Sequence, residues 1–190
     1  MSFPPKNVNP NKRLYTGGIA GSVIELGCGC ALPGLVAAQL AEEVYLTDGF
    51  DSGLESARIS LNANRFLARY GVHIEKLPWG RDVDPIVGKV KSPIKLILAA
   101  DCLYPDMSAW PNFFCTLFQL LSSPSKPVAL VAFHKRSGQQ TLKPFLDYWK
   151  LKMEILPLSE LNLDKNDNIG GTRLPGSSTG SIILYRISLP

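Results

Sequence analysis

Short apolar runs alternate with longer amphipathic stretches along this chain, which is typical of an α/β protein. The apolar runs predict strands, several of them buried on both faces. Stretches in which apolar residues recur every three or four positions predict helices between them. The predicted strands are residues 23–26, 44–48, 72–77, 94–100, 128–134, 151–156 and 181–187. The predicted helices are residues 35–43, 54–67 and 106–121, with a fourth around residues 142–149.

Two segments fall outside this pattern. Residues 1–21 are rich in Pro, Asn and Lys and are expected to be a flexible lead-in. One domain is therefore predicted over residues 22–190, a length that buries a large core without metal or disulfide support. The polar, Gly-rich stretch at 161–179 is expected to help cover a substrate.

Composition excludes some functions. The net charge is +4 with Lys and Arg scattered along the chain, so an acidic partner is compatible but a nucleic-acid surface is not indicated. No apolar run reaches the ~20 residues of a membrane span, and we expect neither a membrane anchor nor a signal peptide, hence a location in the cytoplasm or nucleus. The four cysteines lack C-x-x-C pairing and His partners, so free thiols and no metal site are expected.

A glycine loop follows the first predicted strand. Gly27 and Gly29 let a ligand approach bare backbone, and the helix behind them directs unpaired N–H groups at it. A nucleotide-type cofactor is the expected occupant. The dinucleotide pattern G-x-G-x-x-G is broken because Leu32 stands where the third glycine belongs, so NAD is disfavoured. The alternative is a Gly-rich turn of the kind found in any α/β protein.

The next two strands end in residues suited to a nucleoside. Asp48 lies 19 positions after Gly29, where a carboxylate accepts hydrogen bonds from ribose hydroxyls. Its alternative role is to cap the following helix, which Asp51 also suits. Trp79, within Pro78-Trp79-Gly80, either lies along an adenine face or fills the edge of the core.

The fourth strand leads into Asp101-Cys102-Leu103-Tyr104-Pro105-Asp106, which should lie at the same sheet edge as the glycine loop and line the substrate end of the pocket. After the fifth strand, His134-Lys135-Arg136 either contacts an acidic peptide or is simply solvated. The helical repeat of Trp110, Phe113, Phe114, Leu117 and Leu121 favours core positions.

Taken in order, these motifs resemble the methyltransferase-like protein family of seven-β-strand enzymes (family 16), which modifies protein lysines. The likeness covers about residues 22–188. One branch is further matched by Pro157-Leu158, Leu163-Asp164-Lys165 and Leu174-Pro175-Gly176. The motifs that carry the resemblance are Glu25-Leu26-Gly27-Cys28-Gly29, Leu32-Pro33-Gly34, Asp48, Pro78-Trp79-Gly80 and Asp101-x-x-Tyr104.

The resemblance implies a Rossmann-like, seven-stranded α/β fold of the SAM-dependent methyltransferases, with helices on both faces and a mostly parallel sheet whose last strand is antiparallel. It implies S-adenosylmethionine (SAM) as cofactor, a protein as substrate, and Asp101 and Tyr104 facing the target side chain. The cofactor-binding residues that it implies are Glu25, Gly27, Gly29, Asp48, Trp79 and Ala100.

Two features depart from the family pattern. Family members carry a Trp-containing helix ahead of the glycine loop, whereas no tryptophan precedes Trp79 here, which predicts weaker cofactor binding or a shortened gene model. The branch in question also tends to lack the tyrosine that stands here as Tyr104, which favours the lysine-modifying relatives.

The favoured activity is methylation of lysine, since no adjacent pair of acids of the arginine-specific kind is present. Arginine stays an alternative on the branch resemblance, with Asp101 and Asp106 as its candidate carboxylates. Enzymes that methylate nucleic-acid or glutamine amino groups carry [DN]-P-P-[YFW], where this chain has Cys102-Leu103 in place of the prolines. The further alternatives are small-molecule methylation and a non-catalytic interaction module with the same fold.

Overall fold

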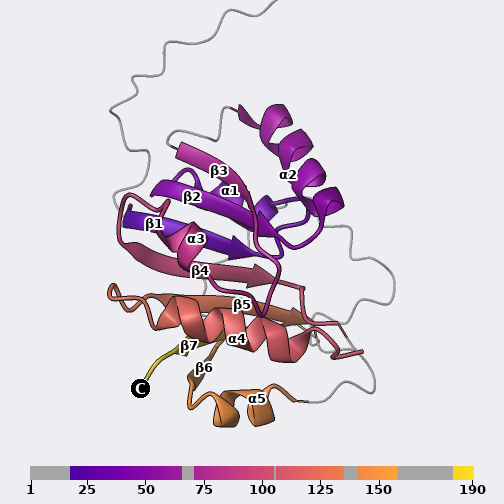
Figure 1. Cartoon of the computed structure of the whole chain (residues 1–190), viewed down its shortest axis with the longest axis vertical. Coiled ribbons are helices and arrows are strands. Elements are labelled where there is room, and N and C mark those ends of the chain that lie inside the picture. The colour runs from indigo at the N-terminus through magenta and orange to yellow at the C-terminus, as the bar shows by residue number, and fades with distance from the viewer. Residues whose placement is uncertain (1–17, 66–70, 105, 135–140, 158–181) are drawn as a thin grey trace, which may run out of the picture.

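The computed structural model describes residues 18–65, 71–104, 106–134, 141–157 and 182–190 (Figure 1). Most of the lead-in, the polar loop at 161–179, Lys135-Arg136 and the branch motifs at 163–165 and 174–176 lie outside the described residues.

A seven-stranded sheet forms the centre of the molecule, in the order β3-β2-β1-β4-β5-β7-β6. Strand β7 pairs antiparallel with both β5 and β6, and the remaining neighbours pair parallel, which confirms the predicted mostly parallel sheet with an antiparallel last strand. The strands are β1 Ile19–Leu26, β2 Ala41–Asp48, β3 Gly71–Lys76, β4 Ile94–Ala100, β5 Val128–His134, β6 Lys152–Leu156 and β7 Ile182–Ser188.

Helices cover both faces of the sheet (Figure 1). Successive residues of β1 point to opposite faces: Val23 packs with α1 and α2, and Ile24 belongs to the core formed with α3, α4 and α5. The predicted aromatic face of α4 is confirmed as core, because Trp110, Phe113 and Phe114 are fully buried. The helices are α1 Leu32–Ala37, α2 Asp51–Ala63, α3 Asp84–Val87, α4 Trp110–Leu121 and α5 Lys143–Tyr148.

Several boundaries differ from the prediction. The helix predicted at 35–43 ends at Ala37, because residues 41–43 join β2 and Glu43 pairs with both β1 and β3. Helix α4 begins at Trp110 and not at residue 106, since Met107 has a φ of +54°, which a helix does not accommodate. The sequence did not predict α3. Strand β1 begins at Ile19, so the end of the expected lead-in belongs to the sheet.

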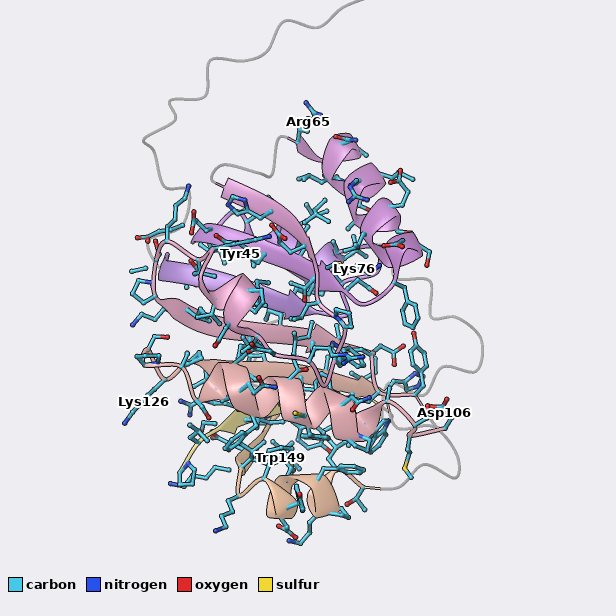
Figure 2. All side chains as sticks on the ribbon, in the orientation of Figure 1. Tyr45, Arg65, Lys76, Asp106, Lys126 and Trp149 are labelled. Carbon is cyan, nitrogen blue, oxygen red and sulfur yellow. The ribbon has the colours of Figure 1, made fainter. Side chains whose placement is uncertain are left out.

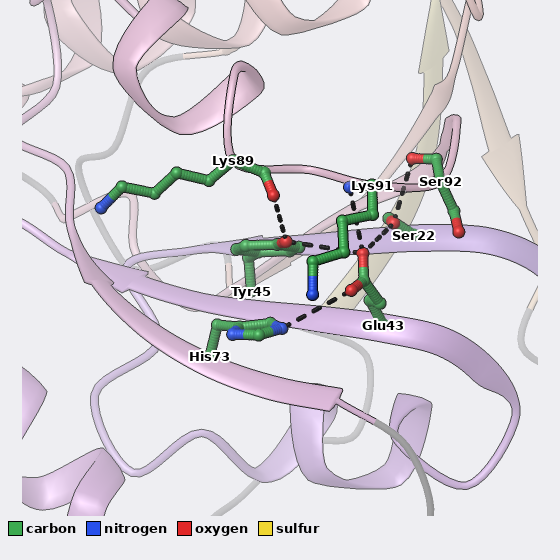
Figure 3. Close-up of polar contacts among 7 residues, drawn as sticks. All are labelled: Ser22, Glu43, Tyr45, His73, Lys89, Lys91 and Ser92. Atoms are coloured by element: carbon green, nitrogen blue, oxygen red, sulfur yellow. Dashed lines mark hydrogen bonds and ion pairs between the residues drawn. The ribbon is translucent and has the colours of Figure 1, made fainter.

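A partly buried polar cluster lies near the amino ends of the strands (Figure 3). The Glu43 carboxylate accepts a hydrogen bond from the Lys91 backbone N–H at 3.2 Å and lies 3.4 Å from both Ser22 Oγ and Tyr45 Oη. These two hydroxyls have closer acceptors in the Ser92 and Lys89 carbonyls, at 3.1 and 2.9 Å. The His73 ring stacks on Tyr45 with centroids 4.6 Å apart, and its Nε2 lies 3.7 Å from Glu43 Oε1. Through Tyr45 and Glu43, the cluster holds the segment ahead of β4 against the amino ends of the strands.

None of the helices in the described ranges is both long and apolar enough to cross a lipid bilayer.

Candidate functional site

A cavity of about 710 Å³ opens at the carboxyl ends of the central strands. Its position agrees with the rule that ligands of open α/β sheets bind where the strand order reverses, here between β1 and β4. The volume lies within the usual range of small-molecule sites. The cavity is lined by residues 27–30 after β1, 48–50 at the end of β2, 78 and 79 after β3, 100–102 and 104 at the end of β4, and by Ala109 and Asn112 beside or within α4.

The glycine loop lies against the tryptophan predicted to border the base. Gly27 has a φ of +64°, and a Cβ placed on it would lie 2.9 Å from Cζ2 of Trp79. A side chain at residue 27 would therefore displace the indole from the cavity wall.

Asp48 is held at the cavity wall by backbone donors. Its Oδ2 accepts a hydrogen bond from the Gly29 N–H at 3.1 Å, and its Oδ1 accepts one from the Phe50 N–H at 2.9 Å. A carboxylate offers about four lone-pair positions, so roughly two stay open toward the cavity for hydroxyl donors. Asp51 forms an ion pair with Lys76 at 2.7 Å, and α2 has no side-chain cap.

Glu25 does not line the cavity. Its side chain is buried, with 2% of the residue exposed, and Oε2 accepts a hydrogen bond from the Gly34 N–H at 3.1 Å. Burial raises the pKa of Glu25 to about 8, although the Gly34 N–H opposes the rise, and the neighbouring Asp48 adds to it. A Cβ on Gly34 would collide with this carboxyl group, which explains the glycine of Leu32-Pro33-Gly34. The structure shows Glu25 supporting the loop, and a direct contact with the cofactor stays a prediction.

Trp79 lies at the cavity wall and also packs against the core. The half-buried indole lines the cavity and also packs edge-to-face on Phe113, with centroids 5.1 Å apart. Its Nε1 atom is buried and has no hydrogen-bond partner within the described part of the chain.

The loop after β4 forms the other end of the cavity. Asp101 has a left-handed backbone, with φ +50°, and its N–H donates to the Ala132 carbonyl at 2.9 Å. Such sparsely populated conformations cluster at functional sites. Tyr104 lines the cavity with 58% of its surface exposed, and its carbonyl accepts a hydrogen bond from Trp110 Nε1 at 2.9 Å. Ala100 also lines the cavity.

The other candidate residues of this region either lie outside the cavity lining or are unreactive thiols at neutral pH. Asp106 does not line the cavity; it is exposed and lies on the outer segment ahead of α4 (Figure 2). His134 is also absent from the lining. Burial raises the pKa of Cys28 and of Cys102 to about 12, so both stay protonated thiols at neutral pH.

All four cysteines are free. Among the described residues no group of three or more His, Cys, Asp or Glu side chains is arranged to hold a metal ion.

The family model described as lysine methyltransferase matches residues 16–150 of the sequence, which is most of the chain. The chain belongs to the lysine methyltransferase family.

Three curated relatives share 27–30% identity with the chain. Methyltransferase-like protein 23 of Dictyostelium discoideum is 28% identical over 75% of this chain and 60% of its own length. Histone-arginine methyltransferase METTL23 of Homo sapiens is 27% identical over 86% of this chain and 83% of its own. Protein N-lysine methyltransferase METTL21A of Xenopus tropicalis is 30% identical over 78% of this chain and 63% of its own length. The chain thus spans less than two thirds of two of these relatives. Methyltransferase-like protein 23 is also the branch that the sequence motifs resemble.

Solved structures confirm the Rossmann-like methyltransferase fold. Precorrin-6y C5,15-methyltransferase of Geobacter metallireducens superposes with a TM-score of 0.59 at 10% identity, over 90% of this chain and 80% of that one. A SAM-dependent methyltransferase of Aquifex aeolicus superposes with a TM-score of 0.55 at 12% identity, over 95% and 90%.

Family and fold together indicate S-adenosylmethionine as the cofactor. The cavity fits a nucleoside of this kind in its chemistry: Asp48 presents a pinned carboxylate for hydroxyls, and Trp79 presents an aromatic wall.

Phe50 and Asn112 are among the lining residues that the sequence did not indicate. Phe50 is 77% exposed although it is large and apolar, and its position two residues after Asp48 was the available signal. Asn112 interrupts the apolar pattern at the start of α4.

Proposed function

We propose that this chain is a SAM-dependent N-methyltransferase that modifies a side-chain nitrogen of a protein substrate, with lysine favoured. The observation that carries the proposal is a single cavity whose wall includes both the Gly27–Asp48 region and the Asp101–Tyr104 region. A cofactor held at the first region can therefore be reached by an acceptor that enters beside the second.

The residues divide by role in this proposal. Gly27 and Gly29 bring backbone close to the cofactor, Asp48 binds the ribose hydroxyls, and Trp79 borders the base. Ala100 contributes an apolar wall. Glu25 positions the loop through Gly34. When bound, SAM supplies a methyl group already activated on sulfonium, so the protein need only align a neutral nucleophile.

A lysine amine must lose a proton before it can accept the methyl group. With a pKa near 10.4, deprotonation at about pH 7.4 costs roughly 4 kcal/mol. Apolar lining beside Asp101 lowers the solvation of the ammonium ion and so reduces its pKa. Asp101 then orients the amine as a hydrogen-bond acceptor, Tyr104 shapes the channel, and water takes the proton.

Arginine is the second candidate because METTL23 relatives are named histone-arginine methyltransferases. Its pKa of ~13.8 requires carboxylates that grip the guanidinium while the proton leaves. In the described ranges, Asp101 is the only carboxylate on the β4 side of the lining, and Asp106 is outside it. This difference supports lysine. The word histone in those names also supports a nuclear location. We therefore propose the nucleus as a location in addition to the cytoplasm.

The test combines transfer with binding. Purified protein, methyl-labelled SAM and a mixed pool of histone and cytosolic proteins are incubated, and hydrolysed product is analysed for methyllysine and methylarginine. We expect methyllysine, and a loss of about 100-fold or more in Asp101→Gly, which removes the acceptor, because a misplaced nucleophile costs that much. Glycine tolerates the left-handed backbone of residue 101. Calorimetry with S-adenosylhomocysteine should give nearly equal affinities for both proteins.

Each other outcome removes one part of the proposal. Label on arginine would overturn lysine, and label confined to metabolites would overturn the protein substrate. An absence of heat with millimolar S-adenosylhomocysteine would overturn the enzyme and favour an interaction module.

A further inference from the structure

Asn112 is the only side-chain amide in the cavity lining within the described residues. It lies in the first turn of α4 and is exposed to the cavity, and its amide makes no hydrogen bond to another residue that the structure describes. The other ionisable or polar side-chain groups of the lining are the carboxylates of Asp48 and Asp101, the Tyr104 hydroxyl, the thiols and the Trp79 indole N–H, which is a donor only. Asn112 alone therefore offers a donor and an acceptor side by side in one plane.

The turn after β3 is shaped to admit this amide. A Cβ on Gly80 would lie 2.5 Å from Asn112 Oδ1, and Gly80 has a φ of +80°. The Gly80 N–H donates to Oγ1 of the fully buried Thr116 at 2.8 Å, one turn further along α4. The amide therefore lies beside the Trp79–Gly80 turn.

We propose that the Asn112 amide recognises the hydrogen-bonding edge of the adenine base of the cofactor. This inference rests on the proposed function, which places the base beside Trp79. Adenine presents its amino group next to a ring nitrogen acceptor, and an asparagine amide pairs with that arrangement in two hydrogen bonds. A carboxylate in the same place would supply acceptors alone, so Asn112 confers selectivity for an adenosyl group.

The test is a thermodynamic cycle in which one group is removed from the protein and one from the ligand. Wild type and Asn112→Ala are titrated with S-adenosylhomocysteine and with its analogue in which hydrogen replaces the adenine amino group. Loss of a bidentate pair predicts about tenfold weaker binding of S-adenosylhomocysteine by Asn112→Ala, and about tenfold weaker binding of the analogue by wild type. The variant should bind both ligands equally, because the partner of the amino group is gone.

Two further variants make the result decisive. Gln119→Ala removes an amide from the same helix that bonds the Arg81 carbonyl but does not line the cavity, so it should keep both affinities. Asn112→Asp, favourable in the first turn of a helix, retains the acceptor for the amino group and should still prefer S-adenosylhomocysteine, with reduced affinity. It serves if the alanine variant fails to fold.

The outcomes separate the two claims. If wild type binds neither ligand, the proposed function fails. If wild type binds and Asn112→Ala discriminates between the ligands as wild type does, the inference about Asn112 alone is overturned.

Discussion

Glu25 and Asp48 are two carboxylic acids at the ends of neighbouring strands, and their surroundings separate their roles. Asp48 reaches the cavity and is held by two backbone donors, whereas Glu25 is enclosed behind the glycine loop with one. An enclosed carboxyl group avoids ionisation, because the charged form loses its hydration. Because Glu25 holds the loop through Gly34, its protonation makes the stability of this part of the fold depend on pH.

The first prediction concerns this coupling. The pKa of Glu25 is 4.5 when unperturbed and about 8 in the folded protein. Between these values the unfolded chain releases a proton that the folded protein keeps, so the free energy of unfolding falls as pH rises, by up to about 1.4 kcal/mol per pH unit. Glu25→Gln should flatten this slope. Urea unfolding of both proteins from about pH 5 to pH 8 measures it, and parallel profiles would contradict the assignment.

The residues that line the cavity show how far the sequence alone reached. Gly27, Asp48, Trp79 and Asp101 follow four different strands, so the rule that parallel strands end at one edge sufficed to group them. The exposure and orientation of the side chains could not be predicted from the sequence. The enclosure of Glu25 and the exposure of Phe50 depend on how the loops pack, which no local pattern encodes.

Among the elements, β4 and β5 match their predicted bounds because each is a long apolar run ended by charged or polar residues. The α1–β2 region does not. Ala41, Glu42 and Glu43 are good helix formers, but pairing with β1 and β3 outweighs a helix preference of a few tenths of a kcal/mol per residue. The four-residue α3 is too short to show a period.

The first turn of α2 depends on Gly53, which leads to the second prediction. A Cβ at residue 53 would collide with the Asp48 carboxyl group. Gly53→Ala should therefore weaken S-adenosylhomocysteine binding several-fold and forfeit the ~0.5–1 kcal/mol that alanine normally adds to a helix. Calorimetry and urea unfolding measure both effects. Ser52→Ala, at the exposed neighbouring position, is the matched control, and equal binding by the two variants would refute the crowding argument.

The third prediction concerns the polar cluster of Figure 3. Glu43→Ala removes the acceptor of the Lys91 N–H, while the Tyr45 hydroxyl keeps the Lys89 carbonyl, and should cost about 0.5–1.5 kcal/mol of unfolding free energy. Affinity for S-adenosylhomocysteine should stay unchanged, since the cavity is at the opposite edge of the sheet. Glu42→Ala, on the same strand but exposed, should change stability by less than about 0.5 kcal/mol. Impaired binding in Glu43→Ala would show that the two edges are coupled.

At the scale of the whole molecule, the cavity joins four strand ends, so a ligand there stabilises the complete sheet. The fourth prediction is that S-adenosylhomocysteine at about 100 times its Kd stabilises the protein by roughly 2.7 kcal/mol. For a chain of this size that raises Tm by roughly 5–10 °C. Thermal unfolding with and without ligand measures the shift. Asp48→Ala should lose it at the same ligand concentration, and an undiminished shift would exclude Asp48 from binding.

The position of β7 between β5 and β6 governs when the sheet can be completed. Strand β6 touches the rest of the sheet through β7 alone, and β5 lacks its second neighbour until β7 arrives. During synthesis on the ribosome, residues 152–156 therefore have no partner strand until residues 182–188 emerge. Nascent chains that lack β7 expose the unpaired edge of β5. Edges of this kind attract chaperones and promote aggregation.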